Sequence, residues 1–170
     1  VNYANDYSDG IRGTDDSRIG PVRLTASGLA SPKAVRTAAQ ISFLFAAVIG
    51  LTLAIATSWW IILVGALAIN AAWGYTGGAN PYGYKGLGDI SVFLFFGIVA
   101  TTGSYFVQTE SLNLEIFIIA IPMGSLACAI LAINNLRDRA QDHIVGKRTL
   151  AVRLGDRGAR RLYIALLISA

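Results

Sequence analysis

Long apolar stretches separated by short polar ones dominate the chain. No charged residue occurs between Arg36 and Lys85, and a helix that crosses a bilayer needs about 20 apolar residues. This stretch therefore predicts two membrane-spanning helices, at residues 37–57 and 60–75. The turn between them carries a pair of tryptophans, which suits the aromatic belt at a membrane interface.

The rest of the chain continues this pattern. Two more complete spans are predicted at residues 90–107 and 114–133, with the start of a further span at 161–170 and the end of an earlier one at 2–8. The chain does not begin with Met and stops within an apolar run. We therefore expect one transmembrane domain over residues 1–170, truncated at both ends. The predicted fold is an all-α integral membrane bundle, a fragment with about four complete spans and two partial ones.

The composition supports the membrane class. Hydrophobic residues make up 54% of the chain and charged residues 14%, whereas a soluble domain carries about 25% charged residues. The single cysteine, Cys128, lies in an apolar run. We expect it to be a small core residue and not part of a disulfide. The net charge of +4 comes from bases that flank apolar segments. This pattern indicates a lipid bilayer as partner and not a nucleic acid.

Basic residues alternate from one side of the predicted bundle to the other. Five Lys or Arg residues precede the first apolar stretch, one lies at Lys85, and eight lie between Arg137 and Arg161. The intervening connections, at Ser58 and at residues 108–113, have none. Because basic loops stay in the cytoplasm, both acidic motifs described next are expected on the cytoplasmic side.

Each of the two acidic motifs forms a polar stripe on a predicted helix. Residues three, four and seven apart share a helix face, and this spacing relates Asn2, Asn5, Asp6 and Asp9, and again Asn134, Asn135, Asp138 and Asp142. Stacked carboxylates at a membrane border repel one another, and a divalent cation relieves that repulsion. All-oxygen ligands suit Mg²⁺. We therefore predict that the four aspartates bind Mg²⁺ and act in catalysis, with the asparagines in support.

Basic residues accompany both motifs. Acid, metal and base together suit a site that holds a diphosphate and stabilises it as it leaves. Beside an apolar bundle, such a site implies a lipid diphosphate as substrate. The predicted diphosphate-binding residues are Arg23, Lys85, Arg137 and Lys147; Arg12, Arg18, Arg148 and Arg153 lie on the same side.

The connector at residues 75–88 is too rich in glycine for a helix. It is either a turn-rich link or part of an acceptor pocket, in which Tyr75 and Tyr84 are the predicted contacts. The sequence leaves both interpretations open.

Other polar residues have simpler interpretations. Charged residues beside a membrane span are often only solvated loop ends, but two similar motifs on one side make that explanation weaker. Asp15 and Asp16 are expected to cap or solvate their loop. His143, the only histidine, is expected in a loop rather than in catalysis.

At these residues the chain resembles the UbiA-type intramembrane prenyltransferases, most closely the branch that prenylates 1,4-dihydroxy-2-naphthoate. The stretches that carry the resemblance are residues 2–15, 20–28, 75–78, 134–142 and 146–155. The family's first motif has the form Asn-Asp-x-x-Asp-x-x-x-Asp. This chain has Gly13 at the last position and Asp15 two residues later, as in the naphthoate branch, which leaves the role of Asp15 open.

The resemblance implies a nine-helix bundle with a lipid-accessible cavity capped by the two acidic segments. It implies Mg²⁺-dependent transfer of a polyprenyl group from polyprenyl diphosphate to an aromatic acceptor, in a bacterial plasma membrane. An acceptor such as 4-hydroxybenzoate or homogentisate is the nearest alternative. A secondary transporter is the alternative from another class, but transporters place ion-binding groups near mid-membrane and these carboxylates fall at helix ends.

Overall fold

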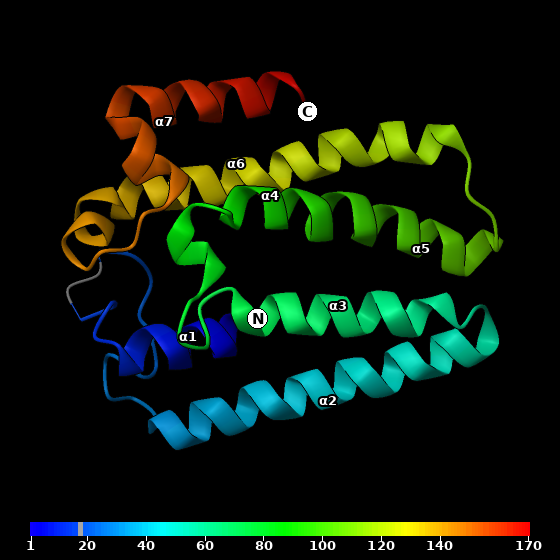
Figure 1. Ribbon diagram of the computed structural model, residues 1–170, viewed down its shortest axis with the longest axis horizontal. Helices are drawn as coiled ribbons and strands as arrows, with labels where there is room; N and C mark the ends of the chain where they lie inside the picture. The colour runs from blue at the N-terminus through cyan, green and yellow to red at the C-terminus, as the bar shows by residue number, and fades with distance from the viewer. Residues whose placement is uncertain (17–18) are drawn as a thin grey trace. The chain divides into compact units, whose positions relative to one another are not determined.

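The computed structural model of the chain describes residues 1–16 and 19–170, and the regular elements in this part are helices (Figure 1). The described residues form two compact units, Val1–Tyr82 and Gly83–Ala170. The predicted all-α class is confirmed. The expected single domain over residues 1–170 stays a prediction.

The first unit consists of three helices, α1 (Asn2–Ile11), α2 (Pro32–Ala56) and α3 (Trp60–Gly74). The short α1 packs against the hairpin that α2 and α3 form. Ser31 caps α2, because its side chain accepts a hydrogen bond from the Ala34 amide at 3.3 Å, and proline occupies the first helical position. The helix therefore begins before the predicted residue 37.

The turn between α2 and α3 lies where the sequence predicts it. Trp59 and Trp60 are 69% and 74% exposed there, as expected for side chains at an interface. The apolar helix α3 has only 15 residues. It is thus shorter than the roughly 20 residues needed to cross a bilayer without help from its neighbours.

The helical stretch from Gly88 to Thr109 in the second unit changes its winding along its length. A 3-10 turn, η1 (Tyr82–Lys85), leads to α4 (Gly88–Val92), the π-helix η2 (Phe93–Val99) and α5 (Ala100–Thr109). The predicted span at residues 90–107 lies within Gly88–Thr109, but the apolar run gave no sign of the π-helix. η2 and α6 approach closely, since a Cβ added at Gly97 would lie 2.4 Å from the Cα of Gly124.

The long helix α6 (Leu114–Ile144) is the centre of the second unit and contacts both η2 and α7 (Leu150–Ile168). Its 31 residues correspond to about 46 Å at 1.5 Å per residue, which exceeds the bilayer core of about 30 Å. The helix therefore continues past the predicted end at residue 133 and includes the second acidic motif. His143 lies exposed in its last turn, so the loop prediction for this residue was wrong.

Helix α7 begins well before the predicted residue 161. Thr149 caps it by accepting a hydrogen bond from the Val152 amide at 3.4 Å. Gly155 then interrupts the helix with φ 69° and ψ 179°, a conformation that only glycine adopts without strain. This first part was not predicted as helix, because charged residues are frequent in it and it forms no apolar run.

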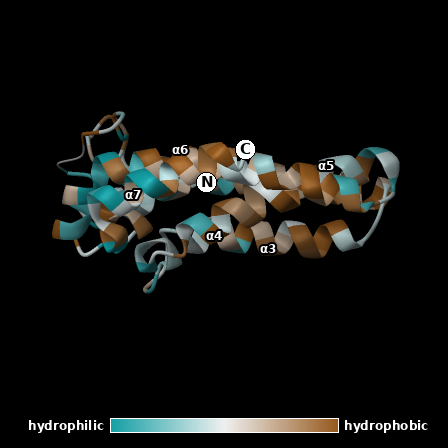
Figure 2. Cartoon of the chain, turned by 90° about the horizontal axis from the view of Figure 1, so that it is seen from above, coloured by the Kyte–Doolittle hydropathy of each residue, from teal (hydrophilic) through white to brown (hydrophobic). Residues whose placement is uncertain are grey.

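Three of the described helical stretches are long and apolar enough to cross a membrane: Pro32–Ala56, Gly88–Thr109 and Leu114–Ile144. Many of their large apolar side chains point outward; Leu44 is 64% and Ile130 is 65% exposed. Figure 2 shows brown apolar residues along α3 and α5. Such faces suit contact with lipid or further helices. Cys128 is only 3% exposed, which confirms its prediction as a core residue.

Candidate functional site

The first acidic motif occupies the buried face of α1. Asp6 and Asp9 are 6% and 2% exposed. Both carboxylate oxygens of Asp6 accept hydrogen bonds at 2.8 Å, from the backbone amides of Leu24 and Thr25. Asp6 therefore fixes the loop that follows α1 on the helix, while each oxygen keeps a lone pair for another partner.

Asn5 of the first motif and the nearby Arg12 contact the glycine-rich connector. The guanidinium of Arg12 donates to the main-chain carbonyls of Thr76 and Gly78, and the Thr76 hydroxyl donates to Oδ1 of Asn5 at 2.9 Å. Thr76 is 1% exposed. Thr76 was not predicted as a site residue, because its signal in the sequence is no more than a polar residue among glycines. The structure thus brings the connector to the first motif within one unit.

The predicted diphosphate ligand Arg23 contacts an acid. Its Nε lies 3.5 Å from Oδ2 of Asp15, whose side chain is 5% exposed. The Asp15 carboxylate is buried next to an arginine, so it does not solvate its loop, and the other expected role, capping the loop, stays a prediction. Asp16 is exposed, as expected. Arg18 lies outside the described residues.

The second acidic motif lies on the last turns of α6, as the helical spacing predicts. Arg137 donates to both carboxylate oxygens of Asp138, at 2.7 and 2.8 Å, and to Oδ1 of Asn134 at 3.1 Å. Asp142 is 5% exposed and accepts a hydrogen bond from the Thr149 hydroxyl at 3.4 Å. Two predicted site residues, Arg137 and Asp138, thus form one charged cluster.

The end of the connector meets the segment after α6, within the second unit. Lys147 places its Nζ 5.2 Å from the centre of the Tyr84 ring, a cation–π contact. The Arg148 amide donates to the Tyr84 carbonyl at 2.9 Å, and Arg153 donates to the Lys85 carbonyl at 2.7 Å. The Lys85 side chain itself is exposed. Three predicted site residues therefore lie together here.

The other predicted residues have separate surroundings. Tyr75 packs edge-on against Tyr82 in the first unit, with 5.5 Å between ring centres. Asn2 is exposed at the start of α1, and Asn135 is half-buried on α6. The two predicted acceptor tyrosines, Tyr75 and Tyr84, thus belong to different units.

The donor atoms fit a hard cation such as Mg²⁺. Among the residues that the structure describes, no cluster of three or more Asp, Glu, His or Cys side chains is found. Mg²⁺ is usually held by one or two carboxylates together with water and substrate phosphates. Each motif carries two aspartates, which is the number of carboxylates that this mode of binding uses.

Comparisons with known proteins cover the whole chain. Residues 1–170 match the UbiA prenyltransferase family. The chain is 52% identical over 170 residues to the 1,4-dihydroxy-2-naphthoate octaprenyltransferase of Mycobacterium tuberculosis, covering 100% of the chain and 58% of that protein. It is 41% identical to the Escherichia coli protein of the same name, covering 99% of the chain and 57% of that protein.

A more distant relative is the Mus musculus protein named UbiA prenyltransferase domain-containing protein 1. It is 40% identical over 93 residues, which are 55% of the chain and 27% of that protein. The chain spans a little over half the length of the bacterial relatives it matches. No solved structure matches the chain.

Proposed function

The chain belongs to the UbiA prenyltransferase family, and from that premise we propose that the full protein transfers a polyprenyl group from its diphosphate to 1,4-dihydroxy-2-naphthoate. The observation that carries this proposal is the 52% identity, over all 170 residues, to a protein named for that acceptor. The reaction would serve menaquinone biosynthesis. The charge pattern further supports a bacterial plasma membrane location with both acidic motifs on the cytoplasmic side.

The acidic motifs are the proposed metal-binding groups. Asp6, Asp9, Asp138 and Asp142 would hold Mg²⁺, with Asn2, Asn5, Asn134 and Asn135 orienting ligands or water. When bound, the metal would neutralise charge that develops on the leaving diphosphate. The burial of Asp9 and Asp142 supports this role. A buried carboxylate attracts a metal ion more strongly than a carboxylate in water does.

The basic residues divide into two proposed groups. Lys85 and Lys147 would contact the diphosphate. The Lys85 side chain is exposed, and the Lys147 ammonium lies over the ring of Tyr84, the residue before Lys85. Arg23 and Arg137 contact Asp15 and Asp138. These two arginines would therefore act on the diphosphate while holding an acid in position.

The reaction then follows from leaving-group stabilisation. The allylic carbon–oxygen bond breaks, and its electron pair leaves with the diphosphate. An electron-rich ring carbon of the acceptor attacks the resulting allylic cation, and the acceptor carboxylate leaves as carbon dioxide. The apolar helices exclude water, which would otherwise capture the cation.

A panel of acceptors tests this function in the full-length protein. Membranes would receive a radiolabelled polyprenyl diphosphate with 1,4-dihydroxy-2-naphthoate, 4-hydroxybenzoate or homogentisate. We expect a prenylated product from the naphthoate and none from the others. A product from another acceptor alone would keep the reaction class and change the substrate. No product from any acceptor, with the diphosphate still bound, would reject prenyl transfer.

A further inference from the structure

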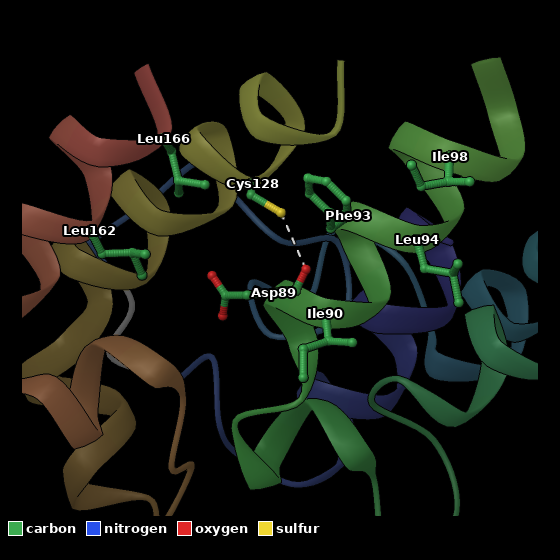
Figure 3. A pocket seen from close by; sticks show the side chains of 8 residues that line it. All are labelled: Asp89, Ile90, Phe93, Leu94, Ile98, Cys128, Leu162 and Leu166. Carbon is green, nitrogen blue, oxygen red and sulfur yellow. Dashed lines mark hydrogen bonds between the residues drawn. The ribbon is translucent and has the colours of Figure 1, made fainter. Parts of the chain in front are cut away.

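Helix α7 turns one side toward the rest of the second unit. Leu162 and Leu166 line an apolar cavity of about 480 Å³ that α7 shares with α6 and the α4–η2 stretch (Figure 3). Ala159 is buried, and the Ser169 hydroxyl donates to the Ser125 hydroxyl of α6 at 3.0 Å. At about 100° per residue, these four positions of α7 lie on one side of the helix. The opposite side is the outer face of α7.

The outer face begins with charge. After the interruption at Gly155, it carries one acid and three arginines, all exposed: Asp156, Arg157, Arg160 and Arg161. Arg160 donates to the Asp156 carboxylate at 2.8 and 3.3 Å. Its side chain nevertheless stays 65% exposed, so this ion pair leaves the guanidinium accessible to another anion.

Helix α6 adds a further base near this face. The pKa of Asp156 lies below its ordinary value, first because Arg160 donates a hydrogen bond to it and further because of the charges of Arg160, Arg139 and Arg157. Arg139 belongs to α6 and therefore lies near the same acid. The arginines outnumber the acid, so this end of the outer face is strongly positive.

Further along the helix, the same face becomes apolar. Ile164, Leu167 and Ile168 follow the arginines on the outer face, and all three are exposed. Eleven residues separate Arg157 from Ile168, which corresponds to about 16 Å at 1.5 Å per residue. A phospholipid has the same order of groups over such a distance, with a charged phosphate followed by hydrocarbon.

Other partners suit only half of this face. A further membrane helix packed against it would remove the arginines from water and would have to supply acids for them. A nucleic acid or a water-soluble acidic protein would pair with the arginines but leave the apolar half in water. An anionic phospholipid matches both halves, because guanidinium groups bind phosphate by paired hydrogen bonds and the acyl chain covers the aliphatic side chains.

We propose that the outer face of α7 binds an anionic phospholipid, with the phosphate on Arg157, Arg160 and Arg161 and an acyl chain along Ile164 and Ile168. A bound lipid would anchor the start of α7 at the membrane surface. The site goes beyond the proposed prenyl transfer and does not depend on it, since none of these residues belongs to the proposed metal or diphosphate sites.

Binding of labelled lipids to the full-length protein tests this site. The protein in nonionic detergent would receive spin-labelled phosphatidylglycerol or phosphatidylcholine, and electron paramagnetic resonance would measure the bound fraction. We expect the wild-type protein to prefer phosphatidylglycerol, and this preference to weaken at high salt. A base near anionic headgroups contributes roughly fivefold in binding. The double variant Arg157→Gln/Arg161→Gln should therefore lose roughly 5- to 25-fold of the preference.

A second double variant controls for net charge. Lys33→Gln/Arg36→Gln removes two exposed bases from α2 in the first unit and should keep the preference of the wild type. The thermal unfolding midpoint would show that both double variants are folded. The KM for the prenyl diphosphate should stay within about twofold in each, because neither variant changes a proposed substrate contact.

Several results would overturn the lipid site. They are equal binding of both lipids by the wild-type protein, an equal loss of preference in the two double variants, and displacement of the labelled lipid by millimolar glycerol 3-phosphate, which has no acyl chain. If Arg157→Gln/Arg161→Gln fails to fold, the comparison of the two lipids on the wild-type protein at low and high salt still decides. Absence of prenyl transfer would overturn the proposed function and leave the lipid site standing.

Discussion

Asp142 illustrates how a residue can serve both the fold and the proposed chemistry. It is 5% exposed on the last turns of α6 and accepts a hydrogen bond from Thr149. A carboxylate so enclosed stays ionised only with donors or cations around it. Its position in the acidic motif and its burial together make it the sharpest single-residue test of the metal role.

We expect Asp142→Asn to lower prenyl transfer by roughly 100-fold or more, the scale on which enzymes respond to loss of one stabilising group at a developing charge. The amide keeps the shape of the side chain and can still accept from Thr149, so the protein should remain folded. Product formation and the thermal unfolding midpoint in detergent would be measured together. Asp16→Asn, an exposed acid of the first unit, is the matched control and should keep full activity. Wild-type turnover by a folded Asp142→Asn protein would contradict the metal role.

Arg12 shows that a basic residue near an acidic motif can be structural. Its guanidinium donates to two carbonyls of the connector, those of Thr76 and Gly78. A lysine presents one compact charge and does not reproduce this planar fork. We expect both Arg12→Lys and Arg12→Ala to lower the free energy of unfolding by about 1–3 kcal/mol.

Thermal unfolding of the full-length protein in detergent would measure this loss. The control is Arg157→Lys, at an exposed position of α7, which should leave the midpoint unchanged. An Arg12→Lys protein as stable as the wild type would show that the fork is not needed.

At the scale of elements, the contact between η2 and α6 depends on two glycines. A Cβ at Gly97 would lie 2.4 Å from the Cα and 2.8 Å from the amide nitrogen of Gly124, so the helices must separate to accept it. We expect Gly97→Ala to destabilise the protein by about 1–3 kcal/mol, the usual cost of overpacking.

The matched control lies in another apolar helix. Gly50 of α2 has no neighbouring atom within 4 Å of an added Cβ, and Gly50→Ala should be neutral or slightly stabilising because alanine favours the helix. Both variants would be compared by thermal unfolding in the same detergent. Equal midpoints for the two alanine variants would contradict the close packing.

The helices themselves could largely be predicted from the sequence. The apolar runs located α2, α3 and α6, and the three- and four-residue spacing correctly put both acidic motifs on helices. The starts of α2 and α7 were predicted too late. Their caps, Ser31 and Thr149, lie several residues before the apolar runs on which the prediction was based. The π-helix η2 was not predicted, because a continuous apolar run does not distinguish it from an α-helix.

Contacts between distant residues of the candidate site could not be predicted in the same way. Residue type and spacing selected Arg23 as a diphosphate ligand, but not that it would contact Asp15. The bond from Thr76 to Asn5 joins positions 71 residues apart. Such pairs depend on tertiary packing, which a local pattern does not encode.

At the scale of the molecule, charge and hydropathy agree with the proposed membrane enzyme. The apolar stretches that are long enough to cross a bilayer carry few charges. The bases gather near the acidic motifs, where the proposed reaction needs positive charge against the leaving diphosphate. Each compact unit contributes one acidic motif, so loss of either motif is expected to stop the reaction of the full protein.

Metal dependence of prenyl transfer tests the proposed function most sharply. Full-length protein would be stripped with EDTA and given radiolabelled polyprenyl diphosphate and 1,4-dihydroxy-2-naphthoate over a range of Mg²⁺ concentrations. We expect no prenylated naphthoquinol without metal and recovery of the product as Mg²⁺ is restored, because oxygen ligands and a diphosphate together suit that ion. Full product formation in the continued presence of excess EDTA would contradict the metal dependence.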